Sequence, residues 1–82
     1  MTENINEQVR VGAIFSGDKV NPVWFTWRDR KYKVEQVTYT WRDREGDAIM
    51  YYFSVAHSAN LYELCLNGKT FVWRLLKVTQ ND

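Results

Sequence analysis

Cysteine, histidine and proline are nearly missing from this 82-residue chain, which has one of each. A single cysteine excludes an intramolecular disulfide and a cysteine-rich metal site. In the strands assigned below, Cys65 and His57 lie about 13 Å apart along the sheet, too far for a catalytic thiol–imidazole pair. We therefore predict that the protein is not an enzyme and uses no cofactor.

An excess of one charge and a long apolar run are also missing. The chain has 11 Lys and Arg residues against 10 Asp and Glu residues, a formal net charge of +1. No apolar run approaches the ~18 residues of a membrane-spanning helix, and the polar start MTENINEQ is unlike a signal peptide. These absences predict a cytoplasmic protein with no membrane partner. They give no support for a dedicated polyanion-binding protein, which usually has a basic excess.

Aromatic residues, by contrast, are 16% of the chain, and their large rings help a small domain to build a core. Apolar and polar residues alternate from residue 9 onward, which is the pattern of strands with one buried face. We expect an all-β domain over residues 9–79, preceded by a disordered tail over residues 1–8. About six antiparallel strands form a meander that curls into a small barrel or half-barrel. The strands are expected at 9–16, 23–27, 32–41, 49–56, 61–66 and 69–78.

Turn residues set the expected strand pairing. Arg28–Lys31 is expected to be a four-residue connection, and Asn67-Gly68 is the strongest hairpin signal because both residues tolerate a type I′ turn. The charged segment Arg42–Ala48 is expected to be a solvated loop without a metal ion. A short helix at Asn60–Leu66 is the alternative for the fifth segment. The expected cross-strand pairs are Trp27 with Tyr32, Phe53 with Leu64, Val55 with Tyr62, Leu64 with Phe71, Tyr62 with Trp73, Tyr52 with Cys65, and Cys65 with Thr70.

The tryptophans of Pro22–Trp41 are assigned to faces by parity. Trp27 falls on the inner face and Trp24 on the outer face. A β-bulge near Glu35–Gln36 would return the later part of the strand, including Trp41, to the inner face. Trp24 is therefore the tryptophan expected to be available to a ligand.

One motif resembles that of a known type of domain. It reads Pro22-x-x-Phe25-x-Trp27-x-x-Arg30-x-Tyr32-x-Val34, followed by Trp41 and Tyr62-x-Leu64. This arrangement is similar to that of small bacterial all-β domains of unknown function. In those domains the turn usually carries glycine, where this chain has Asp29. The resemblance implies a bacterial or phage origin and a β fold, and it implies no active-site residues.

Two surfaces could bind a partner. The outer face of the last three strands is expected to gather Met50, Tyr52, Cys65 and Val72 into a patch with little charge, as in interface cores. Such a patch is an interface, in a homodimer or with another protein, or is buried when the barrel closes, or is a plain exposed surface. A non-enzymatic binding or protein–protein interaction module is therefore the favoured function.

The second surface interleaves aromatic and basic residues, the combination that stacks on bases and holds phosphates. The tetrapeptide Trp-Arg-Asp-Arg occurs at Trp27 and again at Trp41, but a strand of roughly 30 Å separates the copies. The alternative function is therefore weak single-stranded nucleic-acid binding by the first copy and its neighbours. The residues predicted for that site are Trp24, Arg28, Arg30, Lys31 and Lys33.

Overall fold

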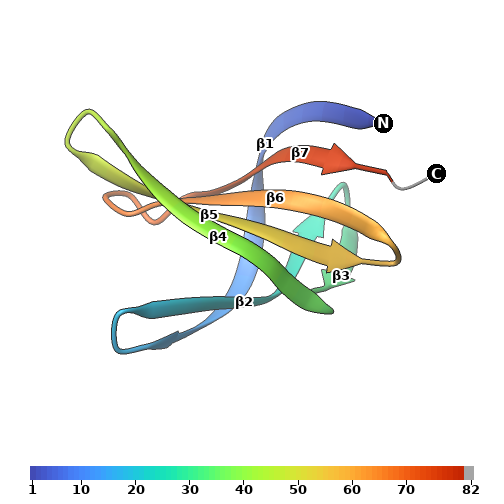
Figure 1. Cartoon of the computed structure of the whole chain (residues 1–82), viewed down its shortest axis with the longest axis horizontal. Coiled ribbons are helices and arrows are strands. Elements are labelled where there is room, and N and C mark those ends of the chain that lie inside the picture. The colour runs from blue at the N-terminus through green and yellow to red at the C-terminus, as the bar shows by residue number, and fades with distance from the viewer. Residues whose placement is uncertain (81–82) are drawn as a thin grey trace.

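The computed structural model describes residues 1–80, which form seven antiparallel strands and no helix (Figure 1). The strands are β1 (Thr2–Ser16), β2 (Lys19–Trp27), β3 (Arg30–Lys33), β4 (Gln36–Glu45), β5 (Ala48–His57), β6 (Asn60–Asn67) and β7 (Trp73–Thr79). They make one sheet in the order β3-β2-β1-β7-β6-β5-β4, curled into a half-barrel. The predicted all-β, antiparallel half-barrel is thus confirmed.

Strand β1 joins the two parts of this sheet. From Thr2 to Val9 it pairs with β7, and from Arg10 to Ser16 it pairs with β2. The strand bends between these parts, as Figure 1 shows. The half-barrel therefore ends in two edge strands, β3 and β4, which are separated in the chain only by Val34 and Glu35.

The first eight residues differ from their predicted state. They were expected to form a disordered tail, but Thr2–Val9 is the part of β1 that pairs with β7. Asn6, with φ 55°, marks an irregularity there, and Arg74 Nε donates a hydrogen bond of 2.8 Å to Asn6 Oδ1. The sequence of this segment has no apolar alternation, because backbone pairing with the edge of β7 holds it in place and a buried apolar face does not.

The β2–β3 hairpin has a tighter turn than the sequence suggested. Arg28 (φ 52°) and Asp29 (φ 64°) are both left-handed and form a two-residue turn of type I′ geometry. Trp27 consequently pairs with Arg30, and the predicted pairing with Tyr32 is wrong by two residues. Because side chains alternate with a period of two, every residue keeps its predicted face.

The predicted third strand, 32–41, is in fact two strands at opposite edges of the sheet. The chain leaves β3 at Val34, whose N–H donates to the Val23 carbonyl oxygen, and enters β4 after Glu35. Strand β4 then runs to Glu45, through residues that were predicted to be a charged loop. Gly46 (φ 62°) makes the two-residue turn to β5 possible.

The bulge in this region follows Val37, which already packs against the core, and this bulge changes the face of Trp41. The irregularity falls between Val37 and Tyr39, where the Thr38 hydroxyl donates to the Ser54 carbonyl oxygen. Tyr39 and Trp41 therefore lie on the outer face, and the prediction that Trp41 points inward is wrong. Val37, which packs against the core, and Trp41 are an even number of residues apart, so one extra residue between them turns Trp41 to the opposite face.

The β5–β6 hairpin agrees with the sequence and the β6–β7 connection does not. Phe53 pairs with Leu64, as predicted, and the helix alternative for this segment is wrong because β6 is a strand. The expected two-residue turn at Asn67-Gly68 is instead a loop over residues 68–72. Asn67 Oδ1 accepts hydrogen bonds from two N–H groups of this loop. The predicted pairs Leu64 with Phe71, Tyr62 with Trp73, and Cys65 with Thr70 are replaced by Leu64 with Leu75, Tyr62 with Val78, and Cys65 with Arg74.

The core lies between the β1–β2–β3 part and the β4–β7 part of the sheet. Phe25 is fully buried, and its ring stacks on Tyr32 at 5.0 Å and contacts Tyr62 at 5.2 Å. Aliphatic side chains from the central strands complete this core: Val55, Leu64, Leu66, Leu75 and Val78. Rings therefore fill the volume that a chain of this size could not fill with aliphatic residues alone.

Candidate functional site

The outer face of β4 and β5 carries a row of aromatic rings. Trp41 is opposite Tyr52, and the two rings stack at 5.0 Å with an interplanar angle of 4°. Tyr39, on the same face, lies 5.4 Å from Trp41. Trp41 is 36% exposed and Tyr39 65% exposed, so no element in residues 1–80 covers them. We call Tyr39, Trp41 and Tyr52 the aromatic row.

The residues predicted from the sequence for an interface lie around this row. Tyr52 belongs to the row, and Met50 lies two residues before Tyr52 on the same face of β5. Met50 pairs with Asn67, whose N–H donates to the Val72 carbonyl oxygen, so Val72 also lies at this end of the sheet. The structure thus places Met50, Tyr52 and Val72 near one another, with the first two on the outer face.

Cys65 lies opposite Tyr52, as predicted, but beneath the surface. It is only 3% exposed, because the larger Tyr52 and Arg74 flank it on the neighbouring strands. Burial raises the pKa of the Cys65 thiol to about 11 and also raises the pKa of the Tyr52 hydroxyl. Cys65 therefore supports Tyr52 from below and is not a reactive surface thiol.

Sequence reasoning missed Tyr39 and Trp41 as members of this surface. In the segment Thr38–Glu45, one face reads Tyr, Trp, Asp and Glu, and the other reads Thr, Thr, Arg and Arg. Neither face is wholly apolar, so parity alone does not identify the buried one. Arg42 and Arg44, on the second face, are exposed, and Arg42 lines an open side of the half-barrel.

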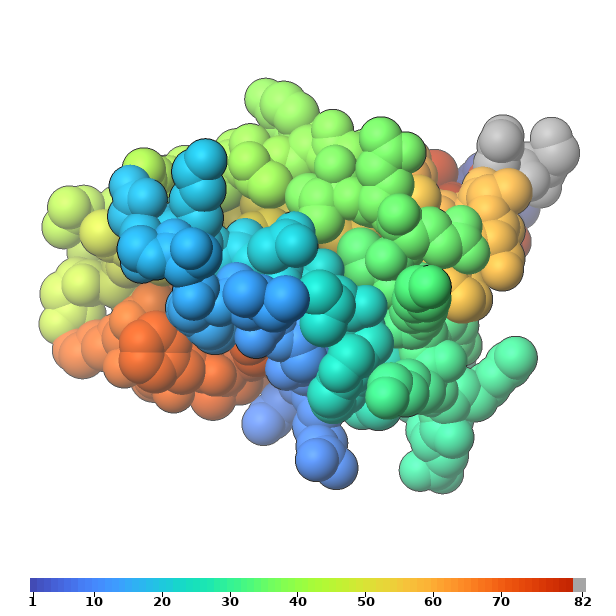
Figure 2. Space-filling view, turned by 90° about the horizontal axis from the view of Figure 1, so that it is seen from below, coloured from blue at the N-terminus to red at the C-terminus, as the bar shows by residue number. Residues whose placement is uncertain are grey.

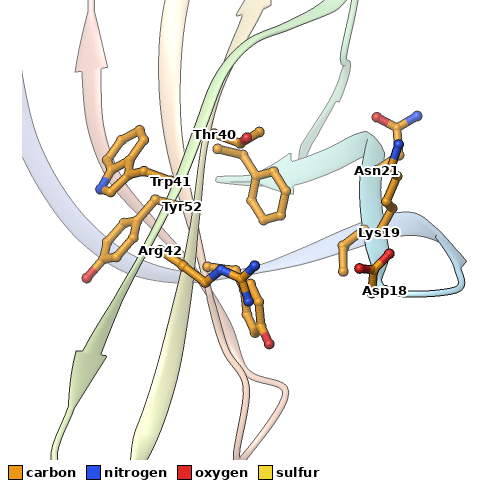
Figure 3. A pocket seen from close by; sticks show the side chains of 10 residues that line it. Asp18, Lys19, Asn21, Thr40, Trp41, Arg42 and Tyr52 are labelled. Carbon is orange, nitrogen blue, oxygen red and sulfur yellow. The ribbon is translucent and has the colours of Figure 1, made fainter.

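That open side is a groove of ≈ 580 Å³ between β4 and the start of β2. Figure 2 shows the β1–β2 hairpin (blue) beside β4 (green) on this side of the molecule. In Figure 3, Asp18, Lys19 and Asn21 lie across the groove from β4, and Trp41 and Tyr52 lie on the far side of β4. Strands β2 and β4 are not neighbours in the sheet, so along this groove the start of β2 pairs only with β1, and β4 pairs only with β5.

The outer face of β1–β2–β3 carries basic residues around Trp24. Gly12 and Lys33 are the partners of Trp24 on the two neighbouring strands, and Lys31 Nζ lies 4.6 Å from the centre of its ring. Arg10 is on the same face, opposite Thr26. Within residues 1–80, none of Arg10, Lys31 and Lys33 forms an ion pair. The face therefore has a net positive charge, although the chain as a whole is nearly neutral.

The two arginines of the β2–β3 turn differ from this basic face. Arg28 Nη2 donates a hydrogen bond of 3.0 Å to Glu7 Oε2, and Trp27 Nε1 donates one of 2.9 Å to Glu7 Oε1. These contacts lower the pKa of the Glu7 carboxyl, and the same carboxylate raises the pKa of Arg28. Arg28 is thus neutralised by Glu7, whereas Arg30 packs over Tyr32 at 5.8 Å.

Of the five residues predicted for nucleic-acid binding, the structure places Trp24, Lys31 and Lys33 on one face. Arg28 and Arg30 lie at its end, beside a second groove of ≈ 670 Å³. Trp24 is not freely available for stacking, because Gly12 lies against one side of its indole and Lys31 against the other. A base could stack on Trp24 only if Lys31 moved aside.

His57 has a structural environment. Its Nδ1 donates to the Lys33 carbonyl oxygen at 2.8 Å, and the Glu35 carboxylate lies 3.8 Å away. The ring also packs edge-on against Tyr32 at 5.2 Å. His57 thereby joins the end of β5 to the β3–β4 connection. Residues 1–80 contain no group of three or more His, Cys, Asp or Glu side chains placed to hold a metal ion, and no helix that could cross a membrane.

Comparison with models of protein families, with curated proteins and with solved structures finds no match to this chain. The similarity to small bacterial β domains therefore stays a prediction from the motif, and the functional argument depends on the surfaces described above.

Proposed function

We propose that this protein is a non-enzymatic protein–protein interaction module that forms a homodimer, with its interface at the aromatic row and the adjoining Met50. The observation that carries this proposal is the stacked pair of Trp41 and Tyr52 on a face where Trp41 and Tyr39 are exposed. Large rings bury much area at low entropic cost, and tryptophan and tyrosine are enriched among residues that dominate binding energy.

The geometry also bears on the alternative that closure of the barrel buries this patch. Trp41 and Tyr39 point away from the core and belong to the edge strand β4, which pairs only with β5. Their exposure supports an intermolecular contact, since an exposed ring cluster on an edge strand is an uncommon feature of an isolated monomer.

The test is sedimentation equilibrium at micromolar concentration, where we expect a dimer. Trp41→Glu should place a charge in the interface and weaken the dimer by at least about tenfold. Leu61→Glu is the matched control, because Leu61 is 39% exposed and Trp41 36%. Tyr52→Glu should also give a monomer. A wild-type protein that is monomeric at these concentrations would contradict the proposed homodimer.

A second candidate function is weak binding of single-stranded nucleic acid, favoured by the basic face around Trp24. Arg10, Lys31 and Lys33 share that face without an ion pair in residues 1–80, and they could contact phosphates. Fluorescence anisotropy with a labelled oligonucleotide at about 50 mM salt tests this function. Lys33→Ala should lower the affinity and reduce the salt slope by about 0.7. Lys77→Ala, on β7, is the control, and absence of binding at low salt would exclude this candidate.

A further inference from the structure

The edge of β4 that faces away from β5 has backbone groups that can pair with a further strand. The turn after Glu45 has two residues, so Glu45 and Ala48 form a hydrogen-bonded pair, and such pairs alternate along an antiparallel ladder. The backbone N–H and C=O groups of Asp43 and Trp41 therefore form hydrogen bonds with β5. Thr40 and Arg42, between and beside them, turn their N–H and C=O groups away from β5, toward the groove.

These outward groups have no partner strand in residues 1–80, because β4 is the last strand of the sheet. The groove of ≈ 580 Å³ keeps them accessible between Thr40–Arg42 and the start of β2. Edge strands in soluble proteins are often blunted by charged side chains that point inward. Arg42 has this position, so it selects against any partner strand that places a second cation opposite it.

We propose that β4 pairs antiparallel with β4 of a second copy of this chain, about a two-fold axis that passes through Trp41. This inference rests on the proposed homodimer and specifies its contact. Thr40 of each copy then pairs with Arg42 of the other, and each of these two pairs exchanges two backbone hydrogen bonds. The run of strands β1-β7-β6-β5-β4 then continues into β4 of the second copy.

The side chains of β4 are complementary to themselves in this register. On the outer face, Trp41 meets Trp41 of the second copy, and the stacked pair with Tyr52 extends across the axis as a continuous row of rings. Tyr39 meets Asp43. On the inner face a threonine hydroxyl, and not a cation, lies opposite each arginine.

The neighbouring registers are less favourable. An axis through Arg42 sets the two guanidinium groups directly opposite each other, which destabilises a strand pair. An axis through Thr40 brings the ladder to the irregularity after Val37 within two residues. Centred on Trp41, the regular segment Tyr39–Asp43 pairs completely.

Charge on the far side of the groove favours the same partner. Arg42 of the second copy projects to the inner face, toward the groove whose opposite wall carries Asp18. Asp18 forms no ion pair within residues 1–80. Each copy therefore offers a carboxylate near the arginine that the other copy brings.

The first test compares Arg42→Pro with Arg42→Ala by sedimentation. Both variants lose the guanidinium, but only proline removes the outward N–H, and an edge strand tolerates proline at such a position. We expect Arg42→Pro to weaken the dimer at least about tenfold more than Arg42→Ala, with unchanged circular dichroism. A dimer that is equally stable in both variants would refute strand pairing while leaving the homodimer itself intact.

The second test reads the register by cross-linking in a Cys65→Ala background. The double variant Tyr39→Cys, Asp43→Cys places each cysteine opposite the other type in the second copy, and it keeps Trp41. Within one chain the two positions are about 13 Å apart and cannot bridge. We expect covalent dimers from the double variant and not from either single variant. A dimer that forms disulfides equally in a single variant, or in none, would overturn the axis at Trp41.

Discussion

A methyl group added at Gly12 would occupy the space of the Trp24 indole. The two residues are directly opposite on β1 and β2. A Cβ at Gly12 would lie 2.1 Å from Trp24 Nε1, whereas ordinary contact begins at 3.4 Å, so the ring must withdraw by 3.4 − 2.1 = 1.3 Å or more. Gly12→Ala should therefore lift a half-buried tryptophan away from the sheet.

The size of the effect follows from the area that the ring would lose. Tryptophan buries roughly 150–250 Å², and exposing about half of this costs about 2–3 kcal/mol at ~25 cal/mol per Å². Alanine in place of glycine in a strand returns about 0.5–1 kcal/mol. We expect the free energy of unfolding to fall by about 1–2.5 kcal/mol and Tm by roughly 4–20 °C.

Urea unfolding followed by circular dichroism measures this loss, and a double-mutant cycle assigns it. In a Trp24→Ala background the added methyl group has room, so Gly12→Ala should be neutral there or stabilising by up to about 1 kcal/mol. The coupling between the two sites should be about 2 kcal/mol. If Gly12→Ala has the same effect in both backgrounds, the contact between Gly12 and Trp24 does not determine it.

Three further predictions concern single residues. The pKa of Cys65 is raised by burial from 9.0 to about 11, so its contribution to stability, at most about 2.7 kcal/mol, is present below pH 9.0 and lost as pH rises toward 11. Cys65→Ala should flatten this decline in urea midpoints, and an unchanged decline would contradict the assignment. Ala59 has φ 66°, so Ala59→Gly should raise the free energy of unfolding by about 0.5–1 kcal/mol, and a loss would contradict that geometry. Gly68→Ala would put Cβ 2.7 Å from the Ile49 carbonyl oxygen, which accepts a hydrogen bond from Gly68 N–H. Because the backbone must move and strain this hydrogen bond, the free energy of unfolding should fall by about 1–3 kcal/mol. An unchanged free energy of unfolding would show that the loop adapts without strain.

The binding surfaces show where local reading of the chain stops. Met50 and Tyr52 were found by parity, because β5 is regular from its first residue to its last and has no bulge against β6. Tyr39 and Trp41 were missed, because their face depends on where one extra residue is inserted. That residue is Thr38, whose hydroxyl donates to the Ser54 carbonyl oxygen of β5, and the contact depends on a residue distant in the chain.

The basic face shows a related limit. Trp24 keeps its predicted outer face even though the predicted register was wrong by two residues, because such an error preserves parity. Lys31, which was predicted to lie in the turn, joins that face only because the turn is tighter. Arg10 was not assigned to this site, since only the pairing of β1 with β2 brings it there. The neutralisation of Arg28 by Glu7 is likewise a contact between residues far apart in the chain.

By itself, the sequence determined the class of fold, the curl into a half-barrel and the inner face of most strands, because alternation with a period of two is a local property that burial imposes on every residue. Only the tertiary structure decided that residues 2–8 join β1, that the third strand divides between two edges, and that Trp41 is exposed on the edge strand β4. These features depend on which distant strand supplies the backbone partner. Because nearly every residue carries the same backbone groups, no pattern of side chains indicates which strand that is.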